Sequence, residues 1–311
     1  MKRSLLISFV SAAVLTASAY ASTVDFSAYS PGAVIGTSTS GTGTSVAVLQ
    51  DGSGDTEFSL YQGFTGGSTA ETSATVYSGA GGNYARMLAS IASPSGRPWS
   101  HVSTTTAFNP LASGQTVEWH SKYTISGVGD SGAIRTGLFA YNAIGSGNAY
   151  TIGQTQSVTT GIDFAVAICV SFQINSNNIQ ITRTNSSGTL QYWDSGSSSW
   201  VGFANAATWS LDTAYDVAIT ADTTAGTLTL TLTDETNNSV VSTAVTAIDE
   251  LGSSAVAGGL RLSTGNLENN SSSGWTFDLD EVSYGAVPEP AEYALMLGMV
   301  VVLGAWLRRR R

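Results

Sequence analysis

Carboxylates near the end of the chain come closest to a spacing that could do chemistry. In the segment DLDE, strand alternation places Asp278 and Asp280 on one face and turns Glu281 away. Two carboxylates on one face can hold a calcium ion or act as the acid and nucleophile of a glycosidase. Three interpretations are open: solvated strand positions, which we favour, a structural calcium site completed by Asp25 in the first strand, or catalysis.

Histidine is scarce, which restricts acid–base chemistry. His101 and His120 are the two histidines of the sequence, and alternation in VEWHSKY places Glu118, His120 and Lys122 on one face. This trio is more typical of a solvated face than of a groove. The sequence has no glycosidase E-x-D-x-E motif, no G-x-S-x-G elbow and no His/Cys cluster for zinc. We therefore expect no catalytic residues and a protein that is not an enzyme.

Two tryptophans offer a binding hypothesis. Trp193 and Trp200 flank the polar loop DSGSSS in a segment typical of a β-hairpin. Their rings can stack across the strands and hold the hairpin together, or they can form an exposed platform for the faces of sugar rings. Trp193 and Trp200 are thus the candidate glycan-binding residues, with a structural role as the alternative.

The elements that must position these residues are strands. TVEWHSKYTIS, FAVAICVSFQI and YDVAITAD are rich in threonine, valine and aromatics and lie between Gly/Ser/Asn/Asp clusters. In GTLTLTLT, Leu228, Leu230 and Leu232 share one face. The pattern predicts an all-β fold, a two-sheet antiparallel β-sandwich with jelly-roll topology. The single cysteine, Cys169, lies in an apolar strand, so we expect it to be buried.

Part of this pattern resembles a known fold family. The stretch YDVAITADTTAGTLTLTLTD, followed by GGLRLSTG and the closing strand WTFDLDEVSY, resembles concanavalin A-like lectin and glucanase domains. The resemblance covers residues 120–285 and rests on strand order and on the final aromatic and acidic strand. It implies a jelly-roll body over residues 22–286. Residues 22–115 either complete that sandwich or form a small separate β unit.

The start of the chain is typical of a secretory signal peptide. Lys2 and Arg3 form a basic region, an apolar stretch follows, and Ala19 and Ala21 stand in the A-x-A arrangement of a cleavage site. We expect residues 1–21 to be removed, which leaves a mature protein outside the cytoplasm.

The end of the chain has three parts in order. Val287, Pro288, Glu289 and Pro290 precede an apolar run over residues 293–307, and Arg308, Arg309, Arg310 and Arg311 close the chain. The run predicts a short transmembrane helix of ~22 Å, with the arginines on the cytoplasmic side. An extended Pro-Glu-Pro at the membrane surface is a shape that a protease can grip.

This order resembles a PEP-CTERM sorting signal over residues 287–311. The resemblance implies a Gram-negative bacterium that makes exopolysaccharide, an exosortase as the processing partner, and membrane attachment only before processing. It also implies display at the cell surface or in the extracellular matrix afterwards. A plain tail anchor is the alternative.

Charge restricts the partners of the body. Residues 22–286 hold six Lys and Arg against twenty Asp and Glu, a net charge of −14. Such a body repels nucleic acid. We expect an exported, surface-sorted, non-catalytic protein associated with extracellular polysaccharide and able to bind glycans. The alternative is a secreted glycosidase or polysaccharide lyase with a divergent site.

Overall fold

The computed structural model describes the strands of the body and most of the turns in its C-terminal half. The described residues are 21–39, 45–49, 58–65, 70–91, 97–104, 116–127, 132–140, 166–173, 176–250, 256–264, 275–287 and 308. The side chains of some strand residues within these ranges are not described.

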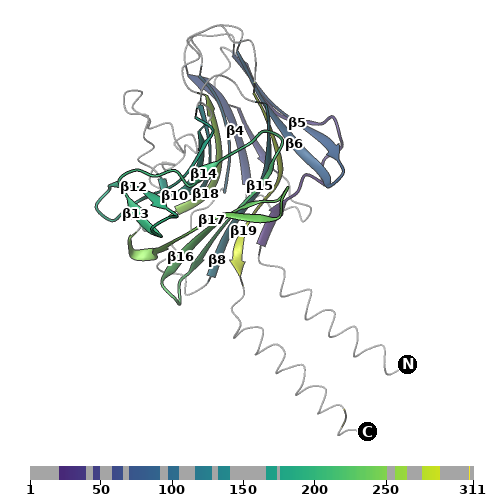
Figure 1. Ribbon diagram of the computed structural model, residues 1–311. Helices are drawn as coiled ribbons and strands as arrows, with labels where there is room; N and C mark the ends of the chain where they lie inside the picture. The colour runs from purple at the N-terminus through teal and green to yellow at the C-terminus, as the bar shows by residue number, and fades with distance from the viewer. Residues whose placement is uncertain are drawn as a thin grey trace.

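Two antiparallel sheets form the body (Figure 1). Sheet A has nine strands in the order β17-β16-β15-β8-β19-β6-β5-β2, with β1 paired to β19. Its strands are β1 (Ala21–Val24), β2 (Val34–Thr39), β5 (Ala70–Gly79), β6 (Gly82–Ile91), β8 (Thr116–Gly127), β15 (Ala214–Asp222), β16 (Thr227–Asp234), β17 (Ser239–Ala247) and β19 (Trp275–Val287).

Sheet B has ten strands in the order β13-β12-β11-β10-β9-β18-β7-β4-β3, with β14 paired to β11. Its strands are β3 (Ser45–Leu49), β4 (Phe58–Thr65), β7 (Arg97–Thr104), β9 (Gly132–Ala140), β10 (Val166–Gln173), β11 (Asn178–Thr184), β12 (Leu190–Asp194), β13 (Ser199–Val201), β14 (Ala207–Thr208) and β18 (Val256–Thr264). A short 3₁₀ helix, η3 (Ile248–Glu250), follows β17.

The two-sheet antiparallel sandwich predicted from the sequence is confirmed. The strands that precede residue 115 pair with the C-terminal ones, since β6 lies beside β19 in sheet A and β7 lies beside β18 in sheet B. The N-terminal strands therefore complete both sheets.

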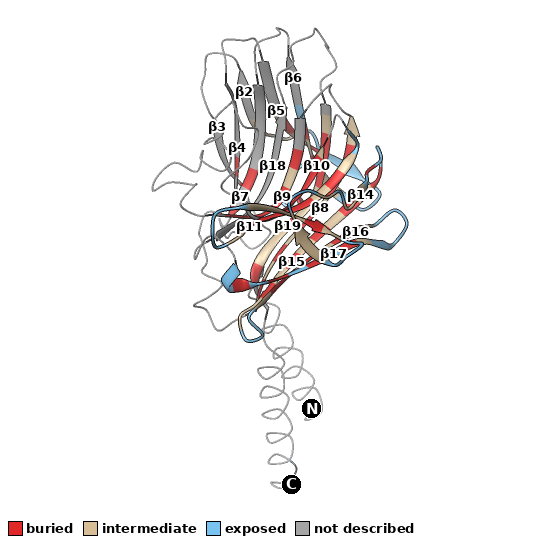
Figure 2. Ribbon diagram, turned by 60° about the vertical axis from the view of Figure 1, so that its left-hand side comes forward, coloured by how far each residue is buried: buried red, intermediate tan, exposed pale blue. Residues whose placement is uncertain are grey.

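Alternation explains why each strand has one buried face. Buried and partly exposed residues alternate along β8, β15 and β16 (Figure 2). Leu228, Leu230 and Leu232 are fully buried, as their spacing predicted, and so is Cys169. Each buried leucine stabilises the fold by about 1.5–3 kcal/mol relative to exposure.

Aromatic rings fill the space between the sheets. Tyr123 of sheet A packs edge-on against Phe172 of sheet B at 5.6 Å between ring centroids, and it stacks on Phe277 at 5.0 Å. Phe172 also contacts Tyr215 at 5.0 Å. These rings come from four different strands, so the pairing of both sheets must be correct before the cluster forms.

One glycine in sheet B is required by a close approach of backbone. Gly137 has φ +158°, and a Cβ there would lie 2.3 Å from the carbonyl oxygen of Ile168. The register between β10 and β9 shifts beside this position, between Val166 and Ile168. A side chain at residue 137 would push β10 away from its neighbour.

The first and last strands lie side by side. Ala21 pairs with Gly285 and Val24 with Val282, so β1 (purple) runs against the end of β19 (yellow) in Figure 1. The predicted signal-peptide cleavage point and the start of the predicted sorting signal thus meet at one place in sheet A. Within the described ranges, no helix has the length and apolar character that a membrane span requires.

Candidate functional site

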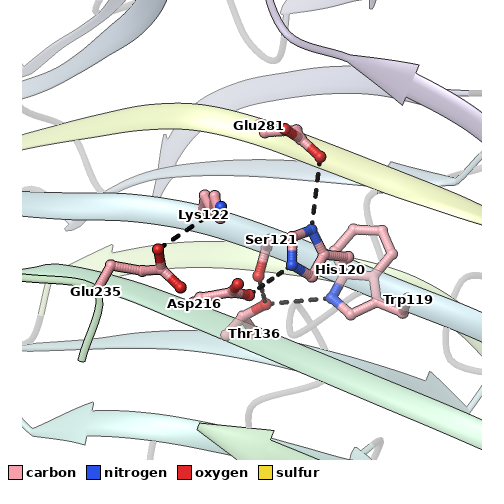
Figure 3. Close-up of polar contacts among 8 residues, drawn as sticks. All are labelled: Trp119, His120, Ser121, Lys122, Thr136, Asp216, Glu235 and Glu281. Atoms are coloured by element: carbon pink, nitrogen blue, oxygen red, sulfur yellow. Dashed lines mark hydrogen bonds and ion pairs between the residues drawn. The ribbon is translucent and has the colours of Figure 1, made fainter. Parts of the chain in front are cut away.

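A histidine flanked by carboxylates lies on the face of sheet A that points away from the core. His120 on β8 has Nε2 2.6 Å from Oδ1 of Asp216 on β15, and Nδ1 3.6 Å from Oε1 of Glu281 on β19 (Figure 3). Beside it, Nζ of Lys122 lies 3.8 Å from Oε2 of Glu235. We call these five residues the His120 cluster.

The opposite face of the same strand turns inward. Trp119 and Ser121 are buried, and both contact the hydroxyl of Thr136 across the core. The Trp119 indole N–H donates to Thr136 Oγ1 at 3.3 Å, and the two hydroxyls lie 2.7 Å apart (Figure 3). This arrangement confirms the alternation that placed Glu118, His120 and Lys122 together on the other face.

Glu281 joins the His120 cluster because β19 contains a bulge. Leu279 pairs with Tyr123, whereas Lys122, the next residue of β8, pairs with Glu281, so Asp280 is an extra residue in β19. The prediction that Glu281 points away from the face of Asp278 was wrong for this reason. A bulge reverses the alternation of every residue that follows it, and simple parity does not include it.

The cluster fixes the charge of the histidine. Burial opposes the protonated form of His120, but the contacts with Asp216 and Glu281 outweigh burial and raise the pKa of His120 to about 9. At neutral pH the imidazole is therefore a positive charge held between two carboxylates. A histidine in this state stabilises the sheet and has no free lone pair to accept a proton.

The surroundings of Asp280 disfavour its charged form, whereas those of His120 favour the charged form. Burial and the nearby carboxylate of Asp278 raise the pKa of Asp280 to about 6, although Lys122 opposes the shift. Glu281 adds to the repulsion. This carboxyl exchanges a proton in the mildly acidic range.

The predicted calcium ligands do not come together. Asp278 forms a bidentate ion pair with Arg86, with both N···O distances 2.7 Å. Asp25 is exposed, and its Oδ1 accepts hydrogen bonds from the backbone N–H and hydroxyl of Ser27. In the described part of the chain, no group of three His, Cys, Asp or Glu residues is arranged to hold a metal ion. The calcium interpretation of Asp25, Asp278 and Asp280 is therefore not supported by the geometry.

Trp193 and Trp200 close the edge of the sandwich. They are cross-strand partners on the β12–β13 hairpin with ring centroids 5.3 Å apart, and Trp193 is only 7% exposed. The Trp200 indole N–H donates to the carbonyl of Val245 on β17, 3.0 Å away. Arg183 lies 4.6 Å from the Trp200 ring. This geometry supports a structural role for the two tryptophans, because the buried Trp193 ring presents no free face to a sugar.

On the other face of the same hairpin, the partly buried Tyr192 contacts the exposed Phe203, which follows β13. Phe203 is 66% exposed, and its ring centroid is 5.4 Å from that of Tyr192. Amides follow along this face of sheet B: Gln180 donates to Asn205 Oδ1 at 3.2 Å and accepts from Gln173 at 3.3 Å. We call these five residues the aromatic–amide surface.

The sequence contained a signal for this surface. Trp193 and Tyr192 are neighbours on one strand, so alternation puts them on opposite faces. The interpretation of Trp193 and Trp200 as an exposed platform selected the face that is buried in the fold. The sequence alone does not show which face of the hairpin the other sheet covers.

The residues of the predicted signals lie mostly outside the described ranges. Ala21 begins β1 and Val287 ends β19, and Arg308 is exposed and helical. Ala19, the Pro-Glu-Pro residues Pro288, Glu289 and Pro290, the predicted span 293–307, and Arg309, Arg310 and Arg311 are not described.

Together, the fold and its surfaces define an all-β sandwich with one acidic sheet face and one face that carries aromatics and amides. No protein-family profile and no curated protein sequence matches the chain. Solved structures of similar fold include plant lectins. A seed lectin from Lotus tetragonolobus is 16% identical with a TM-score of 0.41, over 79% of this chain and 100% of that one.

Two further similar structures have comparable values. Lectin II from Ulex europaeus is 13% identical with a TM-score of 0.39, over 72% of this chain and 92% of the lectin. Arcelin-5, a lectin-like defence protein from Phaseolus vulgaris, is 12% identical with a TM-score of 0.40 over the same shares. At these values the similarity assigns no function.

Proposed function

We propose that this chain is an exported, surface-sorted, non-catalytic protein that binds extracellular polysaccharide through the aromatic–amide surface. The observation that supports binding is the exposure of Phe203 beside Tyr192 on a face that also presents the Asn205 and Gln180 amides. Aromatic faces stack on the apolar faces of sugars, and amides serve as both donors and acceptors for hydroxyl groups.

Two segments of the sequence support export and sorting. The basic, apolar and A-x-A order of residues 1–21 supports secretion by the signal-peptide route. The resemblance of residues 287–311 to a PEP-CTERM signal supports an exosortase partner, attachment to the membrane before processing, and a final place at the cell surface. In the fold, Ala21 at the start of β1 pairs with Gly285 near the end of β19. The two predicted processing points therefore lie beside each other in sheet A.

Glycan binding is tested by removing the exposed ring. Phe203→Ala and Tyr192→Ala should each weaken retention of the full-length chain by a neutral glucan, laminarin, roughly three- to tenfold in affinity electrophoresis. Val34→Ala is the matched control, because Val34 is also exposed, at 61%, but belongs to β2, an end strand of sheet A. Equal retention of all three variants and the unaltered chain would exclude this surface.

A second candidate, a polysaccharide lyase, is supported by one observation. Tyr61 pairs with His101, and His101 pairs with Arg261, so residue types that such an enzyme uses occupy adjacent positions in sheet B. Incubation with alginate and measurement of unsaturated uronate absorbance separates the two functions. Absorbance that develops with the unaltered chain and disappears in His101→Ala would replace the binding function with the enzymatic one.

A further inference from the structure

Two tyrosines stack near the tip of the hairpin that β5 and β6 form. Tyr77 and Tyr84 are cross-strand partners, and their rings lie with centroids 5.9 Å apart and an interplanar angle of 21°. The Tyr84 ring also lies against Gly79, where a Cβ would come within 3.2 Å of a ring carbon. Tyr77 is 43% exposed, so the stack presents an aromatic ring to solvent.

Alternation places this pair on the outer face of sheet A. Val76 and Ala85, which follow the two tyrosines in sequence or precede them, are fully buried in the core. The tyrosines therefore point away from sheet B. Leu88 lies on the same face of β6 and is 38% exposed. The hairpin thus has a solvent-facing aromatic surface that the core does not use.

Arg86 supports the two rings. Its guanidinium carbon lies 5.2 Å from the ring centroid of Tyr77 and 5.6 Å from that of Tyr84. The guanidinium is held in turn by Asp278, to which it donates two hydrogen bonds of 2.7 Å. A guanidinium has more N–H donors than a bidentate carboxylate uses, so Arg86 can also donate to a ligand at the rings. We call Tyr77, Tyr84 and Arg86 the tyrosine–arginine surface.

The chemistry of this surface fits a neutral sugar. The apolar face of a sugar ring stacks on an aromatic ring, and sugar hydroxyl oxygens accept hydrogen bonds from a guanidinium. The charge of Arg86 is balanced by Asp278. Asp280 and Glu281 follow on β19, so this face of sheet A repels an anionic polymer.

The surface is small, which favours a sugar over a protein partner. One exposed ring accommodates one sugar, whereas a stable protein interface buries ~800 Å² on each partner. The outward positions of β5 beside Tyr77 hold Thr75 and Ser73, which are short, polar and only partly exposed. They extend the surface with hydroxyl groups and not with further apolar area.

The tyrosine–arginine surface and the aromatic–amide surface lie far apart. The β12–β13 hairpin contacts β17, which is one end strand of sheet A, whereas β5 is next to the strand at the other end. At the usual strand spacing, β17 and β5 are ~29 Å apart across sheet A. Figure 1 shows the two hairpins on opposite sides of the body. A polymer chain bound at one surface therefore leaves the other surface open.

We propose that the tyrosine–arginine surface is a second binding site for neutral polysaccharide, and that one molecule of this protein joins two polysaccharide chains. This inference rests on the proposed glycan binding at the aromatic–amide surface and adds a site on the other sheet. A single chain with two separate sites links polymers without forming an oligomer, because each molecule supplies both contacts. Such links hold the polymer chains of an extracellular matrix together.

The experiment measures whether one molecule binds two glucan chains. The full-length chain is captured on laminarin-coated beads, washed, and offered fluorescein-labelled laminarin. The unaltered chain should take up the label. Tyr77→Ala and Phe203→Ala should each be captured through the remaining surface. Each should take up roughly three- to tenfold less label per captured molecule, because each has lost one stacking ring.

Three further variants serve as controls. Tyr77→Phe keeps the ring and should take up label like the unaltered chain. Val245→Ala should do the same, because Val245 is 45% exposed on the outer face of sheet A but belongs to β17, at the other end of the sheet. The double variant Tyr77→Ala/Phe203→Ala should not be captured above the level of uncoated beads.

Each outcome decides a different statement. No capture of the unaltered chain would reject glycan binding itself. Capture without uptake of label, or complete loss of capture in Phe203→Ala, would leave the aromatic–amide surface as a single site and overturn the second one. Unchanged uptake in Tyr77→Ala would overturn the role of the tyrosines. A dimer of the unaltered chain in size-exclusion chromatography without laminarin, lost in Tyr77→Ala, would assign the tyrosines to a protein interface instead.

Discussion

Nδ1 of His120 lies 3.6 Å from Oε1 of Glu281, although alternation in DLDE turns Glu281 away from the face of Asp278. The extra residue Asp280 in β19 brings them together, and Asp216 completes the arrangement from the other side. Because these contacts raise the pKa of His120, we expect the stability of the protein to depend on pH.

The first prediction concerns alkaline pH. The pKa of His120 is raised to about 9 in the folded chain from its ordinary value of 6.5, so its stabilisation is complete below about pH 6.5 and is lost as pH rises through 9. The free energy of unfolding should fall by about 2–3 kcal/mol across this window. Urea titrations at several pH values measure it, and His120→Gln should remove the slope. A slope that persists in the variant would assign it to another group.

The second prediction concerns Asp280, whose charge should destabilise the fold. Its folded pKa, about 6, lies above the ordinary value of 3.8, so the charged carboxylate destabilises the fold at neutral pH. Asp280→Asn should raise the free energy of unfolding by about 1 kcal/mol at pH 7.5, after allowance for solvent screening, and have no effect near pH 3.5. A thermal melt at both values tests this, and destabilisation at pH 7.5 would contradict it.

The ion pair between Arg86 and Asp278 should be structural. Arg86→Ala leaves a carboxylate that is 8% exposed without its bidentate partner, and the guanidinium also lies 5.2 Å from the Tyr77 ring. We expect a loss of about 2 kcal/mol, less than for a fully buried pair because Arg86 is partly solvated. The double variant Arg86→Ala/Asp278→Asn should recover part of it in chemical denaturation, and no recovery would mean that the two side chains do not act as a pair.

The hairpin tryptophans should affect stability and leave binding alone. Trp193→Ala removes a buried indole, which costs about 3–5 kcal/mol, whereas laminarin retention per folded molecule should not change. Phe203→Ala should show the reverse, with melting nearly unaltered. Reduced glycan retention by a folded Trp193→Ala protein would restore Trp193 as a binding residue.

Processing is the last prediction. Mass spectrometry of the protein from its native host should find an N-terminus near Ser22 and no Arg308 to Arg311. Cleavage after Ala21 leaves Ser22 to Val24 paired with β19, so the first strand survives the removal of the signal. An intact C-terminus in the mature surface protein would leave a tail anchor in place of the sorting signal.

Much of the fold follows from the sequence because strand alternation is a local property. The spacing of Leu228, Leu230 and Leu232, and that of Trp119 and Tyr123, identifies buried faces without any knowledge of the partner strand. The two-sheet sandwich follows from the number and composition of such segments, and the burial of Cys169 from its apolar strand.

Only the tertiary structure determines which side chains are exposed and which residues of distant strands lie side by side. Which face of the β12–β13 hairpin is covered depends on β17, so only the folded chain shows that Trp193 is buried and Phe203 exposed. The opposition of Arg135 and Arg261 joins strands more than a hundred residues apart in sequence, and the Asp280 bulge depends on how β19 meets β8. Register between distant strands is set by the packing of the whole core, and no local pattern in the sequence contains it.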